Sequence, residues 1–155
     1  MQLFAIISNS DRDAKHSVIL QGDAWTNNIM FKFNDENLPE SIMIDYQVSK
    51  PANPVNDLLY MIFNCTDYES RKVHFYNWID YYHNELDKSL SNYGLKANII
   101  YPRDQLDVDL KRYARSTFGQ SVLLAGLLTM NSEEAGILAK DNRKHLPYLR
   151  KGLKA

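Results

Sequence analysis

The sequence predicts an α+β fold from three observations. Short apolar segments joined by turn-forming residues fill the first third of its 155 residues, a long aromatic helix follows, and helical patterns then run toward the C-terminus. Successive short strands with short connections are typical of an antiparallel meander. We therefore expect an N-terminal antiparallel β-meander of about four strands, packed against the long helix and the C-terminal helices. Residues 97–101 can add a fifth strand at the edge.

The expected strands are residues 3–7, 16–21, 29–33 and 42–48. The last one has the cleanest period-two pattern, with apolar residues at every second position, which is typical of a strand with one dry face. Gly22 and Asp23 form a turn signal after the second strand. Pro51 and Pro54 end the strand-rich region, because proline donates no ladder hydrogen bond and restricts the residue before it.

Helical periodicity begins after the prolines. Asn56 is the expected cap of a short apolar helix, and Thr66 with Glu69 fits a capping box that opens a long helix over residues 68–93. Gly94 is placed to end that helix in a left-handed conformation. Its expected core stripe is Phe75, Ile79, Tyr82, Leu86, Leu90 and Tyr93.

A further helix is expected from Asp104, with an inner face that runs from Leu106 to Leu128. Beyond Ser121 nearly every position is apolar, so we expect that end to be buried all round or against a partner. A final helix begins at residue 131 or 132. The five residues 151–155 form a frayed tail.

Length and composition favour one domain spanning residues 1–155, large enough to fold without a metal or a disulfide. Cys65 is the single cysteine, which favours a reducing compartment. The N-terminus lacks the pattern of a signal peptide, and no apolar run approaches the ~20 residues of a membrane span. We therefore expect a cytoplasmic protein with no membrane association.

Charge is distributed unevenly along the chain. Residues 1–110 carry 16 acidic and 9 basic side chains, whereas residues 111–155 carry 3 acidic and 9 basic ones. A basic C-terminal third can contact phosphates, and Tyr113 can stack on a base, but the slightly acidic chain makes such binding weak. The candidate nucleic-acid-binding residues are Lys111, Arg112, Arg115, Arg143, Lys144, Arg150 and Lys151.

A search for catalytic motifs finds none of the familiar ones. The sequence has no glycine-rich phosphate loop, no HExxH, no paired CxxC and no GxSxG. His83 fits a packing role, the Asp107–Asp109 pair fits the start of a helix, and Cys65 fits a buried apolar position. We therefore assign no catalytic residue, no metal site and no cofactor, and the missing motifs argue against an enzyme.

The long helix has more aromatic residues than its core stripe requires. His74, Trp78, Tyr81 and Glu85 share a flank beside that stripe. Aromatic residues with polar tips are enriched at protein interfaces. The alternative is that the C-terminal helices cover this flank as ordinary core.

The leading functional prediction is a small protein-binding protein that occludes a macromolecular partner, as an inhibitor or an immunity protein does. Its acidic first 110 residues would attract a basic partner such as a nuclease or another toxin. Two alternatives stay open. One is a nucleic-acid-binding accessory protein that uses the basic C-terminal third, and the other is an enzyme whose site is assembled from distant residues.

Overall fold

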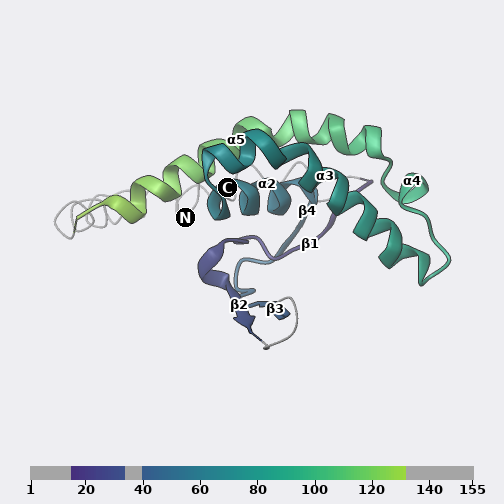
Figure 1. Ribbon diagram of the computed structural model, residues 1–155, viewed down its shortest axis with the longest axis horizontal. Helices are drawn as coiled ribbons and strands as arrows, with labels where there is room; N and C mark the ends of the chain where they lie inside the picture. Colours follow the sequence, from purple (N-terminus) through teal and green to yellow (C-terminus); the bar gives the residue numbers. More distant parts are fainter. Residues whose placement is uncertain (1–14, 34–39, 132–155) are drawn as a thin grey trace, which may run out of the picture. The chain divides into compact units, whose positions relative to one another are not determined.

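The computed structural model describes residues 15–33 and 40–131. The chain falls into two compact units, residues 1–119 and residues 120–155, so the expectation of a single domain stays a prediction. Helices and two small antiparallel sheets build the first unit (Figure 1), which confirms the α+β class. Within the described residues, no helix is both long enough and apolar enough to cross a membrane.

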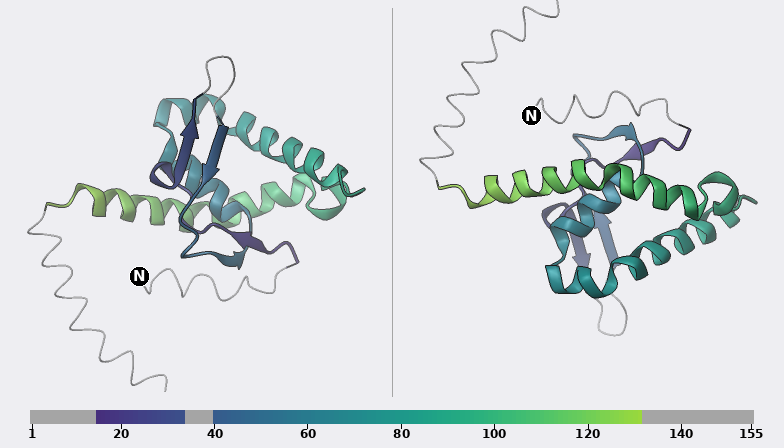
Figure 2. Two further views of the ribbon diagram at one scale, coloured as in Figure 1. Left: turned by 90° about the horizontal axis from the view of Figure 1, so that it is seen from below. Right: turned by 90° about the horizontal axis from the view of Figure 1, so that it is seen from above.

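The strands within residues 15–33 and 40–131 form two separate two-stranded sheets. β2 (Ile29–Lys32) and β3 (Glu40–Met43) form an antiparallel hairpin, whose two arrows lie side by side in Figure 2. β1 (Val18–Leu20) pairs with β4 (Lys50–Ala52), and Ile19 lies opposite Pro51. The predicted four-stranded meander is therefore wrong in topology. Pro51 is tolerated because a two-stranded ladder leaves one edge of β4 unpaired.

The predicted strand over residues 42–48 ends early, at Met43. Asp45 has a positive φ of 58°, which turns the chain out of the strand. The Ile44 N–H donates to the Asn28 carbonyl over 2.9 Å, and the Ser49 N–H donates to the Tyr46 carbonyl over 3.1 Å. Residues 44–49 therefore form a turn that lies against the segment preceding β2.

Two consecutive helices follow β4. α2 (Val55–Cys65) is preceded by Asn53, whose side-chain oxygen accepts the Val55 N–H over 3.0 Å, so Asn53 caps it instead of Asn56. α3 (Tyr68–Ser91) is capped by Asp67, which accepts the Ser70 N–H over 2.7 Å. The expected long helix is thus present, with the cap one residue from the predicted Thr66.

The C-terminal end of α3 behaves as predicted for a glycine stop. Gly94 has a φ of 70°, in the left-handed region that glycine adopts without a Cβ penalty. The Leu95 N–H donates back to the Leu90 carbonyl over 3.1 Å, which satisfies one of the last helical carbonyls.

The predicted fifth strand near residues 97–101 is wrong, because this segment is the short helix α4 (Ala97–Ile100). Asp87 accepts the Ala97 N–H over 2.8 Å, and the Tyr101 N–H donates to the Ala97 carbonyl over 2.7 Å. A short apolar run is compatible with a strand or with a helical turn, and here a side chain of α3 caps the turn. α5 (Arg103–Thr129) begins after two intervening residues.

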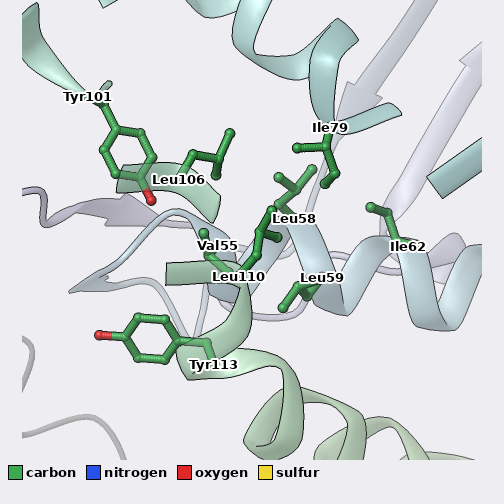
Figure 3. Close-up of a cluster of buried hydrophobic side chains, with 9 residues drawn as sticks. All are labelled: Val55, Leu58, Leu59, Ile62, Ile79, Tyr101, Leu106, Leu110 and Tyr113. Carbon is green, nitrogen blue, oxygen red and sulfur yellow. The ribbon is translucent and has the colours of Figure 1, made fainter. Parts of the chain in front are cut away.

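The core of the first unit lies between α2, α3 and α5. Figure 3 shows aliphatic side chains of α2 gathered with residues of the other helices, and Tyr101 and Tyr113 also belong to this cluster. Leu106, Leu110, Tyr113 and Thr117 are buried, as the inner face of α5 predicts. The cluster consists of Val55, Leu58, Leu59, Ile62, Ile79, Tyr101, Leu106, Leu110 and Tyr113.

Several expectations about burial are corrected. Tyr93 lies beyond the end of α3 and is 81% exposed, so it does not extend the core stripe. The apolar end of α5 is not buried all round within the chain, because Val122 and Leu128 are exposed, and the alternative that a partner covers it stays a prediction. Cys65 is exposed rather than a buried apolar residue. The predicted strand over residues 3–7, the final helix and the tail over residues 151–155 lie outside the described residues.

Candidate functional site

The loop from Gln21 to Asn28 carries two polar side chains that contact each other. It connects β1 to β2 and includes the short 3-10 helix η1 (Thr26–Asn28). The Asn28 side-chain amide donates to the Asp23 carboxylate Oδ2 over 2.9 Å and to the Asp23 carbonyl over 3.0 Å. Asn28 is buried and Asp23 is half-buried. The amide therefore fixes the carboxylate of Asp23 relative to the loop that carries it.

A second donor holds the other oxygen of the Asp23 carboxylate. The Tyr60 hydroxyl, from α2, donates to Asp23 Oδ1 over 3.1 Å. Burial and the neighbouring Asp23 charge raise the pKa of the Tyr60 phenol above its ordinary value. Tyr60 therefore keeps its proton and stays a donor at physiological pH.

The backbone of the loop is held by a carboxylate at the start of α2. Asp57 Oδ2 accepts the Gln21 N–H over 2.7 Å, and Asp57 Oδ1 accepts the Gly22 N–H over 3.1 Å. Burial raises the pKa of Asp57, while these two backbone hydrogen bonds oppose that shift. Gly22 is required here, because its φ is 89° and an added Cβ would lie 2.6 Å from the Val48 carbonyl oxygen.

The turn that carries Asp45 is attached to the same loop. The Gln21 side-chain amide donates to the Ile44 carbonyl over 2.9 Å and to the Asp45 carbonyl over 3.0 Å. Gln47 donates to the Asp45 carboxylate over 3.2 Å, and Asp45 is exposed. Two loops distant in sequence thus present Asp23, Asn28 and Asp45 from one connected hydrogen-bonded group.

The predicted partner-binding flank comes together around a cavity of about 400 Å³ between α2 and α3. Trp78, Tyr81 and Glu85 line it, and the His74 ring lies 5.9 Å from the Trp78 ring. Tyr81 is 67% exposed, Trp78 is half-buried, and Glu85 pairs with Lys88 over 2.5 Å. The flank is therefore not ordinary core, and its partner-binding role stays a prediction.

His83 and Asp109, for which the sequence predicts structural roles, make structural contacts. His83 is buried and its Nε2 lies 3.0 Å from the Tyr101 carbonyl oxygen, as a packing role predicts. Asp109 is buried and accepts hydrogen bonds from Asn53 and Tyr101. His83 and Asp109 thus connect α3 and α5 to Tyr101, and Asp109 also binds Asn53.

The candidate nucleic-acid residues divide into two groups. Lys111, Arg112 and Arg115 are exposed on α5, whereas Arg143, Lys144, Arg150 and Lys151 lie outside the described residues. Tyr113 is buried in the core and is not available to stack on a base, so that part of the prediction is wrong.

The polar group around Asp23 is built entirely from residues 21–60, within a segment that matches a known family. The model of the ecdysteroid kinase-like family matches residues 2–95, well over half of the chain. The chain belongs to the ecdysteroid kinase-like family. No curated protein and no solved structure matches it.

Family membership corrects the leading functional prediction. The prediction of an inhibitor or immunity-type protein is wrong, because the matched family is kinase-like. The match gives no support to the nucleic-acid-binding alternative either. The family match also conflicts with the argument that the chain is not an enzyme because catalytic motifs are missing.

Asp23, Asn28, Asp45, Asp57 and Tyr60 are not among the candidate residues that the sequence predicts. Residues 22–28 have the composition of a turn, because asparagine, aspartate and glycine are common in turns. The usable signal was an aspartate followed five positions later by an asparagine, with a second aspartate ending the next hairpin. This pattern is too short to identify a site from the sequence alone. It identifies one only when the fold brings the two loops together.

Proposed function

We propose that the chain carries the catalytic loop of a phosphotransferase, with Asp23 as the general base and with Asn28 and Asp45 as magnesium ligands. Its family is kinase-like. Protein kinases carry an aspartate base and a metal-binding asparagine in the pattern H-R-D-x-x-x-x-N, and a second metal-binding aspartate in D-F-G. Asp23 and Asn28 have this spacing, and Asp45-Tyr46-Gln47 stands in the D-F-G position downstream.

One observation carries the proposal. The Asn28 amide contacts the Asp23 carboxylate, and Gln21 attaches the Asp45 turn to the same loop. A chance match of spacing would not require the loop of Asp23 and Asn28 to be joined by hydrogen bonds to the turn of Asp45. This connection supports a shared site.

The available donor atoms suit a magnesium ion. The Asn28 amide nitrogen faces Asp23, so its carbonyl oxygen is the atom left for a ligand, and the Asp45 carboxylate is exposed. Among the described residues, no three His, Cys, Asp or Glu side chains cluster as a complete metal site. Magnesium in kinases takes one or two carboxylates and completes its shell with water and substrate phosphates, so this donor set fits it.

The chain's own residues then have separate tasks. Asp23 takes the proton of the attacking hydroxyl as the O–P bond to the acceptor forms and the bond to the departing nucleoside diphosphate breaks. Tyr60 and Asn28 hold the two carboxylate oxygens of Asp23 in place, and Asp57 holds the backbone of its loop. Bound magnesium would neutralise the charge of the phosphates.

The acceptor class follows from the proposed base. An aspartate that accepts a proton suits a hydroxyl acceptor, and the family description names an ecdysteroid. An alcohol of that type is therefore the first acceptor to test.

Metal–nucleotide binding by the whole chain is the primary test. Paramagnetic Mn²⁺ with ADP should broaden the amide resonances of Asn28 and Asp45 and leave the centre of α3 sharp. Asp45→Asn should weaken Mn²⁺–ADP binding by about tenfold or more, since an amide replaces a charged ligand. Asp104→Asn, the same change at an exposed site on α5, is the matched control. Binding that is absent, or equal in the two variants, overturns the proposal.

Phosphoryl transfer tests the role of Asp23. The chain is incubated with ATP, Mg²⁺ and an ecdysteroid, and phosphorylated product is measured by mass spectrometry. Asp23→Asn should lower the rate by about 10²-fold or more, because it removes the base. Product formed at the same rate by Asp23→Asn removes Asp23 from that role.

A further inference from the structure

Gln21 uses every polar atom of its side chain to connect two loops. Its Oε1 accepts the Asp23 N–H over 2.6 Å, and its Nε2 donates to the Ile44 and Asp45 carbonyls over 2.9 and 3.0 Å. Gln21 is 5% exposed. A carboxamide has one acceptor oxygen and two N–H donors, so this arrangement uses both donors and the acceptor.

The same position in the kinase pattern is histidine, two residues before the catalytic aspartate. A neutral imidazole has one donor and one acceptor, and an imidazolium has two donors and no acceptor. Histidine therefore cannot make all three of these bonds at once. Glutamine makes all three.

We propose that Gln21 is a positioning residue that holds the Asp45 turn against the catalytic loop. The proposal rests on the proposed function, because it concerns how Asp45 is presented as a metal ligand. Gln21 itself does not touch the reacting atoms.

The backbone of the turn explains why a fixed connection matters. Asp45 has a φ of 58°, a conformation that non-glycine residues adopt infrequently. Because both amide donors of Gln21 bind the carbonyls of residues 44 and 45, they hold the peptide units on either side of the Asp45 Cα. Loss of these bonds frees the turn to relax and moves the carboxylate of Asp45.

The first experiment needs no metal or nucleotide. Hydrogen exchange of the whole chain is compared between wild type, Gln21→Ala and the matched control Gln105→Ala, which removes a glutamine amide on α5. Gln21→Ala should speed exchange at the Asp23 and Ile44 amides by about tenfold, since both depend on the connected loops. Amides in the middle of α3 should keep their wild-type rates.

Two results overturn the connection. Faster exchange at Asp23 alone, with Ile44 and Ser49 unchanged, shows that Gln21 does not hold the turn. Faster exchange throughout α3 as well shows that Gln21 serves only global stability. Neither result depends on metal binding, so the outcome is separate from that of the proposed function.

The second experiment uses Gln21→His, which keeps a polar side chain at the position but cannot make all three hydrogen bonds. The affinity for Mn²⁺–ADP is measured at one pH, and Gln21→His should bind about tenfold more weakly than wild type, because the Asp45 turn is held less firmly. Equal affinity of the two proteins overturns the role of Gln21 in presenting Asp45, even when binding itself supports the proposed function.

Discussion

Replacement of Asp57 by asparagine tests how the catalytic loop is held. Asp57 lies in the first turn of α2 and accepts two backbone N–H groups of the loop, those of Gln21 and Gly22, one on each carboxylate oxygen. Asparagine has nearly the same shape but keeps only one acceptor oxygen. Its NH₂ group would then face a backbone N–H, and that donor would lose its partner.

The expected cost follows from the number of bonds lost. One donor left without a partner in a buried region costs about 1–3 kcal/mol, and bonds to a charged group lie toward the upper part of that range. Asp57 is half-buried, so water satisfies part of the loss, and we expect about 1–2 kcal/mol. In a chain of 155 residues this corresponds to a decrease of roughly 3–7 °C in melting temperature.

Thermal unfolding followed by circular dichroism at about pH 8 measures this decrease. Asp104→Asn makes the same chemical change at an exposed position and should shift the free energy of unfolding by no more than ~0.5 kcal/mol. Hydrogen exchange should locate the Asp57→Asn effect at Gln21 and Gly22. Equal stability of the two variants would show that Asp57 does not hold the loop and that α2 does not position the candidate site through this side chain.

Two further predictions concern stability. Leu106→Ala should lower the free energy of unfolding by about 2–5 kcal/mol in chemical denaturation, because Leu106 is fully buried. Tyr81→Ala, at an exposed position of α3, should lower it by no more than ~0.5 kcal/mol. Similar losses in the two variants would contradict the core assignment. The Ser70 N–H lowers the pKa of Asp67 below its ordinary value of 3.8, so this helix cap stabilises the fold above that value and the contribution disappears as pH falls through the lowered pKa. Asp67→Ala should therefore lower the melting temperature at neutral pH and abolish this part of the acid-dependent decrease, and an unchanged acid profile would argue against the cap.

Much of the helical part of the fold follows from local chemistry. Apolar residues at spacings of three and four define one face of α3 and of the first half of α5, and Gly94 ends α3 where a left-handed residue is required. These signals work because a helix makes its hydrogen bonds within a short segment. Leu106 and Leu110 could therefore be placed in the core before any contact was known.

The strands were harder to predict because their partners lie far away in sequence. Pairing of β1 with β4 joins residues on either side of the β2–β3 hairpin, and no local pattern encodes that choice. The end of β3, near Asp45, was also hard to predict from the local pattern. The alternation over residues 42–48 predicts a longer strand, but a positive φ at Asp45 turns the chain after β3.

The candidate site was missed because its residues have ordinary local explanations. Asp23 and Asn28 are good turn formers, and Asp57 is a good first-turn residue for a helix. The local patterns do not show that Asp57 and Asp23 bind groups outside their own elements. Asp57 accepts backbone N–H groups of the loop, and Asp23 accepts the Tyr60 hydroxyl of α2.

The most informative residue is therefore the one that connects the most elements. A side chain that only completes a turn needs one or two local bonds, and a change in it alters one loop. Gln21 binds Asp23 in its own loop and the peptides on both sides of Asp45, while its backbone N–H binds Asp57 of α2. A single substitution there changes the geometry between the proposed base and the proposed metal ligand and leaves both side chains intact. Variants of Gln21 thus separate how the two acids are arranged from what each acid does.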